Sequence, residues 1–348
     1  SAAVNESVKL AKKLTRGLSG FVNAILRSVI REQDTIGIED LAANDIETIS
    51  FIYNIPLWLI NLWIQEFGRD KTEDLCAWFN EQPKLTARIN TILIDIPQCL
   101  ALLDEQGWDV TQDTNYKDII YINSHRGSLE KSEAFIKGYI TFMDKASMLV
   151  ARLVNPQPGE RILDCCAAPG GKSMYMAALM DNVGSLMSCD IHEHKIELMN
   201  SNAERLGASI VHTKVQDATK LPDSWKSYFD RVLVDAPCSG LGILQKKLDM
   251  RWRKQESILS ELPPLQLAIL ERAAMMVKEK GYLIYSTCTL NYKENEEVVE
   301  AFLQKHKEFS IIPVAEDFPL KSNSGMITTY PPTDDMDGFF MVKMQRIS

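Results

Sequence analysis

The chain has 348 residues, of which 45% are hydrophobic and 24% charged, and its formal net charge is −9 at pH 7. This composition is that of a folded globular protein with ample core, and the length favours two or three domains. The negative balance argues weakly against nucleic acid as a partner, because nucleic-acid-binding domains are usually basic. The most apolar window, residues 55–64, is too short to span a membrane, so we expect no membrane partner.

Cysteine and histidine spacing predicts no metal site. The seven cysteines include no C-x-x-C pair, and the five histidines do not group with them. An odd number of cysteines and no signal-peptide pattern suit free thiols in a reducing compartment, which predicts a cytoplasmic protein. We also expect the protein to be a monomer.

Apolar residues recur at helical spacing over residues 2–14 and 20–31, and a polar stretch follows at 31–45. Two helices are too few for an independent domain. We therefore interpret residues 1–55 as the last part of an all-α domain whose earlier helices are absent.

Residues 56–143 predict a small α+β module. Its helices are expected at 56–67, 71–81 and 99–105. Its strands are expected at 86–95, 108–112 and 118–123. Residues 138–144 are expected to link this module to the rest of the chain.

From residue 144 onward, strand-like and helix-like stretches alternate. Strands are expected at 162–163, 185–190, 209–213, 229–235, 281–287, 309–313 and 338–345. Helices are expected at 147–154, 193–206, 265–280 and 292–305, with one more beginning near residue 171. This alternation predicts an α/β domain over 144–348 with a parallel, doubly wound sheet, whose ligands bind at the carboxyl ends of the strands.

The turn that leads into the helix near residue 171 is the most informative stretch. Residues 161–173 read Arg-Ile-Leu-Asp-Cys-Cys-Ala-Ala-Pro-Gly-Gly-Lys-Ser. Glycines without Cβ atoms would let a ligand approach the backbone, and the N–H groups of a helix start favour a carboxylate or phosphate. Lys172 in the first helical turn opposes the helix dipole, so we expect it to serve a ligand.

Three ligands could use such a turn. A P-loop requires glycine at the position that Cys166 occupies. A dinucleotide fingerprint requires separated glycines, whereas Gly170 and Gly171 are adjacent. The remaining candidate is S-adenosyl-L-methionine, with its carboxylate at the helix start.

Three aspartates follow three successive predicted strands. Asp190 could accept hydrogen bonds from both ribose hydroxyls, and Asp217 could accept one from an adenine amine. Asp235 closes the next strand. Each could alone be a cap or turn residue, but three acids behind a Gly-Gly turn are much more specific together.

Two cysteines are predicted at the same edge of the sheet. Cys238 follows the strand that Asp235 closes, and Cys288 ends the next one. Asn291 and Glu294 then form a pair like a capping box for the following helix. A thiol beside a helix start has its thiolate favoured, which would make it a nucleophile at neutral pH.

A thiolate beside a methyl donor points to a pyrimidine. Addition of sulfur at ring carbon C6 makes C5 nucleophilic enough to take a methyl group, whereas oxygen and nitrogen acceptors need no such step. Asp235 could hydrogen-bond the protonated N3 of cytosine, which would favour cytosine over uracil. The target base must be unpaired or flipped out.

A basic segment at residues 245–254 holds five cations, one anion and one tryptophan. We predict that it contacts nucleic-acid phosphates, although a solvated basic loop is an equally simple interpretation. The predicted contacts are Lys246, Lys247, Arg251 and Arg253.

Four motifs resemble the Sun/Fmu-type RNA (cytosine-5)-methyltransferase family, and most closely its members that modify bacterial small-subunit (16S) ribosomal RNA. They lie at residues 163–172, 235–240, 286–288 and 337–340. The resemblance covers nearly the whole chain. Residues 20–27 are similar to the end of the NusB-like RNA-binding helical domain found in such enzymes.

The resemblance implies a Rossmann-like S-adenosyl-L-methionine-dependent methyltransferase domain preceded by a small RNA-binding module. It implies that Cys288 is the C6 nucleophile and that Cys238 assists product release. The residues alone leave this choice open, because a Pro-Cys pair is the nucleophile motif of DNA cytosine-5 enzymes. The implied cofactor-binding residues are Cys166, Ala167, Ala168, Pro169, Gly170, Gly171, Lys172, Asp190, Asp217 and Asp235.

The sequence departs from the family pattern at two places. Residues 246–249 read Lys-Lys-Leu-Asp where the family often has a basic His-Pro-Asp pattern, and residues 53–56 read Tyr-Asn-Ile-Pro where it has Ser-His-Pro. These changes bear on the choice of RNA more than on the chemistry. The alternatives are the same chemistry on transfer RNA or another ribosomal site, and a non-catalytic RNA-binding scaffold.

Overall fold

A computed structural model of the chain describes residues 2–15, 17–32 and 46–347. The chain forms two compact units, Ser1–Asn54 and Ile55–Ser348. The first contains α1 (Ala2–Leu14), α2 (Ser19–Glu32) and α3 (Ile46–Tyr53). The first two helices end within one residue of their predicted bounds, and α3 is additional. Most of the predicted polar stretch, residues 33–45, lies outside the described residues.

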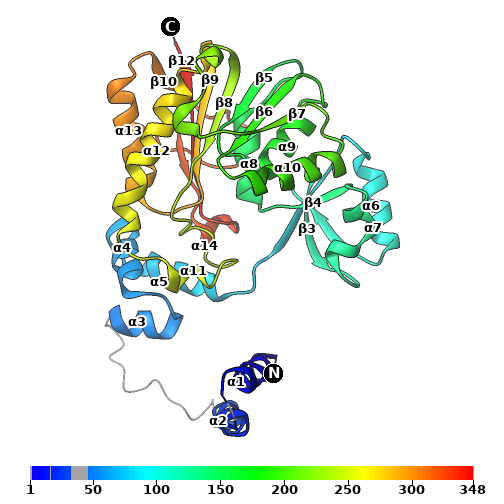
Figure 1. Ribbon diagram of the computed structural model, residues 1–348, viewed down its shortest axis with the longest axis vertical. Coiled ribbons are helices and arrows are strands. Elements are labelled where there is room, and N and C mark those ends of the chain that lie inside the picture. Colours follow the sequence, from blue (N-terminus) through cyan, green and yellow to red (C-terminus); the bar gives the residue numbers. More distant parts are fainter. Residues whose placement is uncertain (1, 16, 33–45, 348) are drawn as a thin grey trace. The chain divides into compact units, whose positions relative to one another are not determined.

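The second unit begins with a four-stranded sheet in the order β2-β3-β1-β4, in which every neighbouring pair is antiparallel. Its strands are β1 (Leu85–Ile89), β2 (Asp109–Gln112), β3 (Ile119–Ser124) and β4 (Ile140–Phe142). The helical elements beside this sheet are α6 (Ile96–Glu105), the 3-10 turn η1 (Leu129–Lys131) and α7 (Glu133–Ile136). The helices α4 (Leu57–Phe67) and α5 (Arg69–Asn80) lie apart from it in Figure 1, where they pack on each other, and α5 also contacts α14 (Pro331–Asp334).

The expected linker at residues 138–144 is wrong, because it contains β4. This strand pairs with β1 through Ala87 and Phe142, and it buries Ile140. The alternation Ile-Thr-Phe is too short to stand out in the sequence, and the strand is fixed by its partner rather than by its own pattern.

The main sheet of the second unit has eight strands (Figure 1). They are β5 (Arg161–Asp164), β6 (Ser185–Asp190), β7 (Val211–Val215), β8 (Phe229–Asp235), β9 (Val277–Thr287), β10 (Phe309–Ile311), β11 (Met326–Thr328) and β12 (Phe340–Arg346). The order is β10-β12-β9-β8-β5-β6-β7, with β11 on β12.

The sheet is mixed rather than wholly parallel as predicted. Strands β5 to β9 pair in parallel, whereas β12 is antiparallel to β9 and to both β10 and β11. An antiparallel edge on a parallel sheet is common in α/β folds. The parallel part still brings the carboxyl ends of β5, β6, β7, β8 and β9 to one edge.

Helices cover both faces of this sheet (Figure 1). One face carries α8 (Lys145–Val154), α9 (Gly171–Leu179) and α10 (Glu193–Arg205), and the other carries α12 (Ile258–Ala274) and α13 (Glu296–Lys305). The remaining short elements are η2 (Ala218–Lys220), η3 (Asp223–Trp225), α11 (Met250–Arg253), η4 (Tyr292–Glu294) and α14 (Pro331–Asp334).

Helix α12 was predicted at residues 265–280, and it lies earlier in the chain. It runs through Pro263 and Pro264 and ends at Ala274. It starts early because Leu259 is buried in its first turn, and it stops early because β9 begins at Val277. Packing here overrides the tendency of proline to interrupt a helix.

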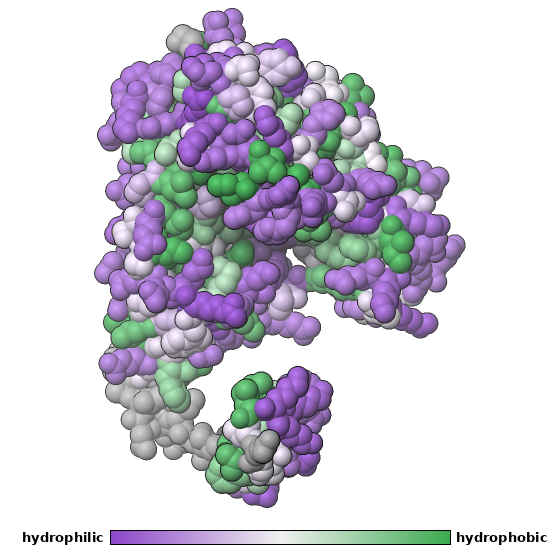
Figure 2. Space-filling view, viewed as in Figure 1, coloured by the Kyte–Doolittle hydropathy of each residue, from purple (hydrophilic) through white to green (hydrophobic). Residues whose placement is uncertain are grey.

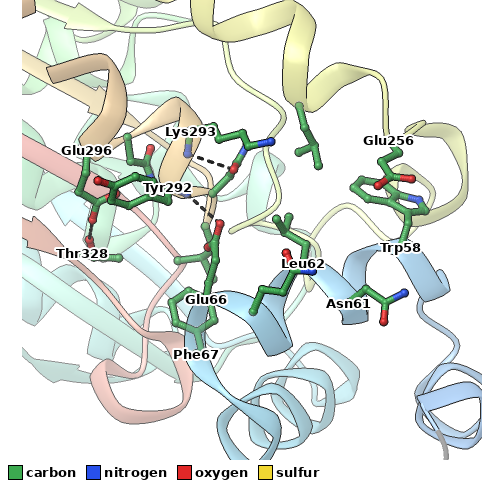
Figure 3. Close-up of a pocket in the computed structure, with 15 residues that line it drawn as sticks. Trp58, Asn61, Leu62, Glu66, Phe67, Glu256, Tyr292, Lys293, Glu296 and Thr328 are labelled. Carbon is green, nitrogen blue, oxygen red and sulfur yellow. Dashed lines mark hydrogen bonds between the residues drawn. The ribbon is translucent and has the colours of Figure 1, made fainter. Parts of the chain in front are cut away.

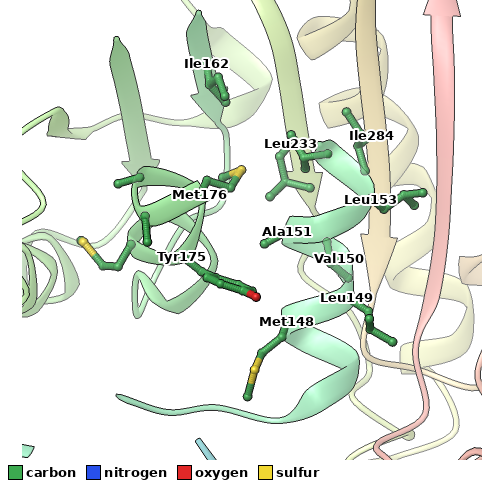
Figure 4. Close-up of a cluster of buried hydrophobic side chains, with 14 of the residues drawn as sticks. Met148, Leu149, Val150, Ala151, Leu153, Ile162, Tyr175, Met176, Leu233 and Ile284 are labelled. Carbon is green, nitrogen blue, oxygen red and sulfur yellow. The ribbon is translucent and has the colours of Figure 1, made fainter. Parts of the chain in front are cut away.

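Alternate residues of each central strand face opposite layers, as strand geometry requires. Leu233 and Ile284 join the core beneath α8 and α9, and Figure 4 shows Ile284 beside Leu153 of α8. Their neighbours Val232 and Leu283 join the core beneath α12 and α13. The face of the second unit seen in Figure 2 is by contrast mostly hydrophilic with scattered apolar groups. In the described part of the chain, every helix is too short or too polar to cross a bilayer.

Asn90 joins the small sheet to the main domain of the second unit. Its side chain is fully buried, and its Nδ2 donates to the carbonyl oxygens of Gly138 and Leu206, each at 2.9 Å. One side chain therefore ties the end of β1, the turn before β4 and the end of α10 together.

We predict that Asn90→Asp lowers the free energy of unfolding by about 1–3 kcal/mol, because a carboxylate cannot donate to either buried carbonyl. Urea denaturation at pH 7 measures the change. The matched control is Asn123→Asp, which makes the same change on an exposed side chain. Equal stabilities for the two variants would show that the Asn90 bridge contributes nothing.

Candidate functional site

A cavity of about 600 Å³ opens at the carboxyl edge of the main sheet. It is bordered by the residues that end or follow β5, β6, β7, β8 and β9. Those among them that the sequence singled out are Cys166, Ala168, Asp190, Asp217, Asp235, Cys238 and Cys288. The strand ends thus bring together side chains that are far apart in the chain.

Asp190 and Asp217 lie on the wall formed by β6 and β7. Asp190 is nearly buried, and its Oδ1 accepts the backbone N–H of His192 at 2.9 Å. Asp217 accepts from both the backbone N–H and the hydroxyl of Thr219, and these hydrogen bonds lower the pKa of its carboxyl. Both aspartates are therefore held in fixed orientations as acceptors beside the cavity.

The Gly-Gly turn packs closely against neighbouring side chains. Gly170 has φ +99°, and a Cβ there would meet Cγ of Met199 at 3.2 Å. A Cβ on Gly171 would approach Sδ of Met143 at 3.5 Å. Gly170 is therefore required for a left-handed conformation at the start of α9 and for packing against α10. The expectation that these glycines let a ligand approach the backbone stays a prediction. Cys166 and Ala168 line the cavity, but Ala167, Pro169, Gly170, Gly171 and Lys172 do not.

Lys172 forms a partly buried ion pair across the sheet edge. Its Nζ donates to Oδ2 of Asp235 at 2.7 Å, and the hydroxyl of Ser286 donates to Oδ1 of the same carboxylate at 2.8 Å. Although burial alone would lower it, the pKa of Lys172 is raised by Asp235 and also by the nearby Cys288. Lys172 therefore stays protonated, with a partner within the chain.

Asp164, at the end of β5, has an unusual environment that its motif did not reveal. It is fully buried, and its Oδ2 accepts the hydroxyl of Ser173, which in turn accepts that of Ser188. Burial raises the pKa of Asp164 to about 7, and the negative charge of Asp235 adds to the effect. Only the fold shows this, because nothing in the sequence marks how deeply the end of β5 is covered.

The two cysteines lie in contact. The Sγ atoms of Cys238 and Cys288 are 3.3 Å apart, and both side chains are partly exposed. The interaction with Cys288, together with burial, raises the pKa of the Cys238 thiol well above its ordinary value of 9.0. Cys238 does not lie beside a helix start, because the next helix along the chain, α11, begins only at Met250.

A second cavity of about 390 Å³ shares Cys288 and Ile243 with the first. Its lining includes Phe339 and Met143, with Lys246 and Lys247 nearby. Cys288 thus borders both cavities instead of pointing into packed hydrocarbon. Among the described residues, His, Cys, Asp and Glu form no group that could hold a metal ion.

The basic segment does not form one continuous exposed stripe. Lys247 and Arg253 are exposed, and Arg253 pairs with Asp249 at 3.2 Å. Lys246 is half-buried between two carboxylates, with Nζ 2.9 Å from Asp337 and also bonded to Asp144.

Arg251 corrects the prediction of a phosphate contact. It is buried, and its guanidinium donates to Oδ1 of Asn80 at 2.7 Å and to the carbonyl of Phe79 at 2.5 Å. Its pattern in the sequence is that of a surface cation, yet it fastens α11 to the end of α5.

The fold and the cavity define a Rossmann-like methyltransferase. The chain belongs to the RsmB/F family, because a family profile described as 16S rRNA methyltransferase RsmB/F matches residues 151–345. A ferredoxin-like domain of RsmF/B-like methyltransferases matches residues 55–127, and the NusB family matches residues 1–31. These matches confirm the resemblance and the fold class predicted from the motifs.

Individual relatives extend over the whole chain. It is 36% identical over 352 residues to the probable ribosomal RNA small subunit methyltransferase B of Bacillus subtilis (strain 168), covering 99% of this chain and 78% of that protein. It is 37% identical to the protein so named from Synechocystis sp. over 99% of this chain and 78% of the other. The crystal structure described as that of PH0851 has a TM-score of 0.85 and 29% identity, covering 96% of this chain and 74% of that one.

We predict that Asp164→Asn flattens the decline in stability from about pH 4 to 7. Burial raises the pKa of this carboxyl from its ordinary 3.8 to about 7, so the folded state binds more protons than the unfolded state in that window. Protonated Asp164 therefore contributes stability that is lost as pH rises through this window, and the variant lacks this contribution. Urea denaturation across the window measures both slopes.

The control for this test is Asp181→Asn, which replaces an exposed aspartate. This variant should keep the wild-type dependence of unfolding free energy on pH. If Asp164→Asn also retains it, Asp164 does not titrate as its burial requires.

Proposed function

We propose that this chain is an S-adenosyl-L-methionine-dependent RNA methyltransferase that modifies C5 of a cytosine in small-subunit (16S) ribosomal RNA. One observation carries the proposal: two sulfurs 3.3 Å apart lie where two cavities meet. The description of the family and the names of the relatives from Bacillus subtilis and Synechocystis support the RNA substrate.

The larger cavity fits S-adenosyl-L-methionine. Its acceptors Asp190 and Asp217 suit the ribose hydroxyls and the adenine amine, and Ile191 and Ile269 provide apolar surface for the ring. The turn from Cys166 to Lys172 would hold the amino-acid end, with Asp235 beside it. When bound, the cofactor supplies an electrophilic methyl carbon on a sulfonium sulfur.

The proposed reaction begins when the Cys288 thiolate bonds to C6 of the cytosine. The C5–C6 double bond opens, so that C5 becomes nucleophilic and forms a bond to the methyl carbon as the carbon–sulfonium bond breaks. A base then removes the C5 proton, the S–C6 bond breaks, and Cys288 leaves as a thiolate while the C5–C6 double bond is restored. Atoms and charges balance with S-adenosylhomocysteine, 5-methylcytosine and one proton as products.

The other side chains support these steps. Cys238 lies in contact with the nucleophile and holds its own proton, so its S–H can donate a hydrogen bond to the departing Cys288 thiolate as the S–C6 bond breaks. Lys172 places a positive charge near Cys288, the sulfur that bonds to C6 in the proposed reaction. Asp235, fixed by Lys172 and Ser286, would accept a hydrogen bond from protonated N3 of cytosine.

We propose three parts for the chain: a NusB-like segment at 1–55, an RNA-binding module at 56–143 and the catalytic domain at 144–348. The profile matches at 1–31, 55–127 and 151–345 support these parts. Within the second unit, the module contributes Met143 and Lys84 to the smaller cavity, which we propose admits the target nucleotide. The monomeric state remains a prediction.

The two cysteines provide the direct test. We predict that Cys288→Ala abolishes methyl transfer to 16S ribosomal RNA, because no adduct can form. We predict that Cys238→Ala accumulates a covalent RNA–protein complex, because elimination stalls. Radiolabelled methyl transfer, denaturing gels and mass spectrometry of the nucleosides measure product and adduct.

The control for the cysteine test is Cys99→Ala, which removes a buried thiol from α6. An adduct with Cys288→Ala instead would reverse the two roles. Methylation of transfer RNA but not of 16S ribosomal RNA would show that transfer RNA is the substrate. RNA binding without any methylation would favour a non-catalytic RNA-binding scaffold.

We predict that Lys247→Ala weakens RNA binding and lowers the slope of log K against log salt by about 1, because an exposed cation beside the smaller cavity can neutralise one phosphate. Fluorescence anisotropy over a salt series measures the slope. Lys305→Ala is the matched control, since Lys305 is exposed on α13 and pairs with Glu271. A slope that Lys247→Ala leaves at the wild-type value would contradict the proposed contact.

A further inference from the structure

Glu294 is a fully buried carboxylate that the proposed reaction does not yet use. Four hydrogen-bond donors surround it. Its Oε2 accepts from the backbone N–H of Ser239 at 2.8 Å and from Nε2 of Gln266 at 2.9 Å. Its Oε1 accepts from the hydroxyl of Ser239 and from Nδ2 of Asn291 at 2.9 Å. A ring of donors suits an ionised carboxylate, which is an acceptor only.

These contacts join the loops that carry the two cysteines. Ser239 follows Cys238 directly, while Glu294 lies in η4, just beyond Cys288. Gln266 of α12 donates both to Glu294 and to the carbonyl of Pro237 at 2.9 Å. The Pro237-Cys238-Ser239 turn is therefore held from both ends, and Glu294 is the group that its bonds have in common.

A second layer of hydrogen bonds repeats this connection. The hydroxyls of Ser239 and Thr289 are 2.7 Å apart, and the backbone N–H of Gly242 donates to the carbonyl of Cys288 at 3.0 Å. Asn295 adds one more hydrogen bond to this layer, because its Nδ2 donates to the carbonyl oxygen of Thr289 at 3.0 Å. Breaking the Glu294 contacts would therefore loosen the Cys238 loop without unfolding the sheet edge.

The outer side of η4 is held as well. In Figure 3, Glu66 of α4 lies beneath Tyr292, and its carboxylate accepts the backbone N–H of Tyr292 at 2.9 Å. A pocket of about 570 Å³ lies outside this contact, lined by α4 and η4 among others. Glu294 points away from that pocket, toward the cysteines, as its partners show.

The charges around the two thiols are unequal. Lys172 lies near Cys288. The contact with Cys288 and burial raise the pKa of the Cys238 thiol most, and the negative charge of Glu294 adds to this effect. The other titratable groups that face the pair are Asp235, which pairs with Lys172 in the same cavity, Tyr285, which is buried beside Cys238 and Glu294, and Glu66, which faces Glu294 from α4. A cation near one sulfur and an anion near the other make the two thiols chemically different.

We infer that Glu294 is the positioning residue that holds the Cys238 loop against Cys288 and keeps the Cys238 sulfur protonated, so that Cys288 alone starts the reaction as a thiolate. This inference rests on the proposed function and deepens it. Glu294 does not touch the substrate in this arrangement. It acts through Ser239 and through its charge.

The test is Glu294→Gln, which keeps the size of the side chain and removes its charge. The full-length variant should bind S-adenosyl-L-methionine and RNA with wild-type affinity, while kcat falls by about 10- to 100-fold because the loop is displaced. Alkylation of Cys238 by iodoacetamide, followed by peptide mass spectrometry from pH 7 to 10, should reach its half-maximal rate at a lower pH than in wild type.

Glu297→Gln is the matched control, because it removes an equal charge from an exposed side chain of α13. It should leave kcat and both alkylation profiles at wild-type values. A wild-type Cys238 profile in Glu294→Gln would overturn the electrostatic part of the inference even if kcat falls. Wild-type kcat would overturn the positioning part.

Ser239→Ala keeps the inference testable if Glu294→Gln does not fold. It removes the Ser239 hydroxyl that donates to Glu294. It should lower kcat by a smaller factor than Glu294→Gln and leave the affinities for S-adenosyl-L-methionine and RNA unchanged. Alkylation of the two thiols needs no RNA, so it tests Glu294 even if the wild-type enzyme proves inactive on cytosine. If the wild-type enzyme does not methylate cytosine but the alkylation profile of Cys238 shifts as predicted, the proposed function is rejected and the role of Glu294 is retained. If the wild-type enzyme is active but the alkylation profile of Cys238 in Glu294→Gln does not shift, the proposed function is retained and the electrostatic role of Glu294 is rejected.

Discussion

The parallel pairing of β8 with β9 is the constraint on which the site depends. Its register sets Asp235 opposite Ser286, so the chain leaves both strands at the same level of the sheet. Cys238 and Cys288 follow within a few residues, which is why their sulfurs meet at 3.3 Å. A shift of this register would separate the sulfurs and also break the hydrogen bond from Ser286 to Asp235.

Much of the fold could be predicted because strands buried on both faces carry strong apolar patterns. The bounds of β6 and β8 agree with their predictions, and the motifs placed Asp190, Asp217 and Asp235 at strand ends that share a cavity. The short strand β4 and the antiparallel edge depend on pairing with distant segments, and a local pattern cannot show such pairing.

The side chains of the site were harder to predict than its location. Arg251 and Lys246 have the pattern of surface cations, yet both are neutralised or held by residues far away in the chain. Glu294 was expected to cap a helix with Asn291. That contact exists, but three further donations come from Ser239 and Gln266. Burial and tertiary partners decided each of these functions.

The buried carboxyls also change how acidic the molecule is. The formal charge of −9 counts every Asp and Glu as ionised, whereas burial moves the pKa of Glu66, Asp164 and Asp337 to about 7. Folding must therefore take up protons from a neutral buffer, and the native molecule is less anionic than its composition suggests. A polyanion approaching it meets correspondingly weaker long-range repulsion, and a mildly acidic medium reduces that repulsion further.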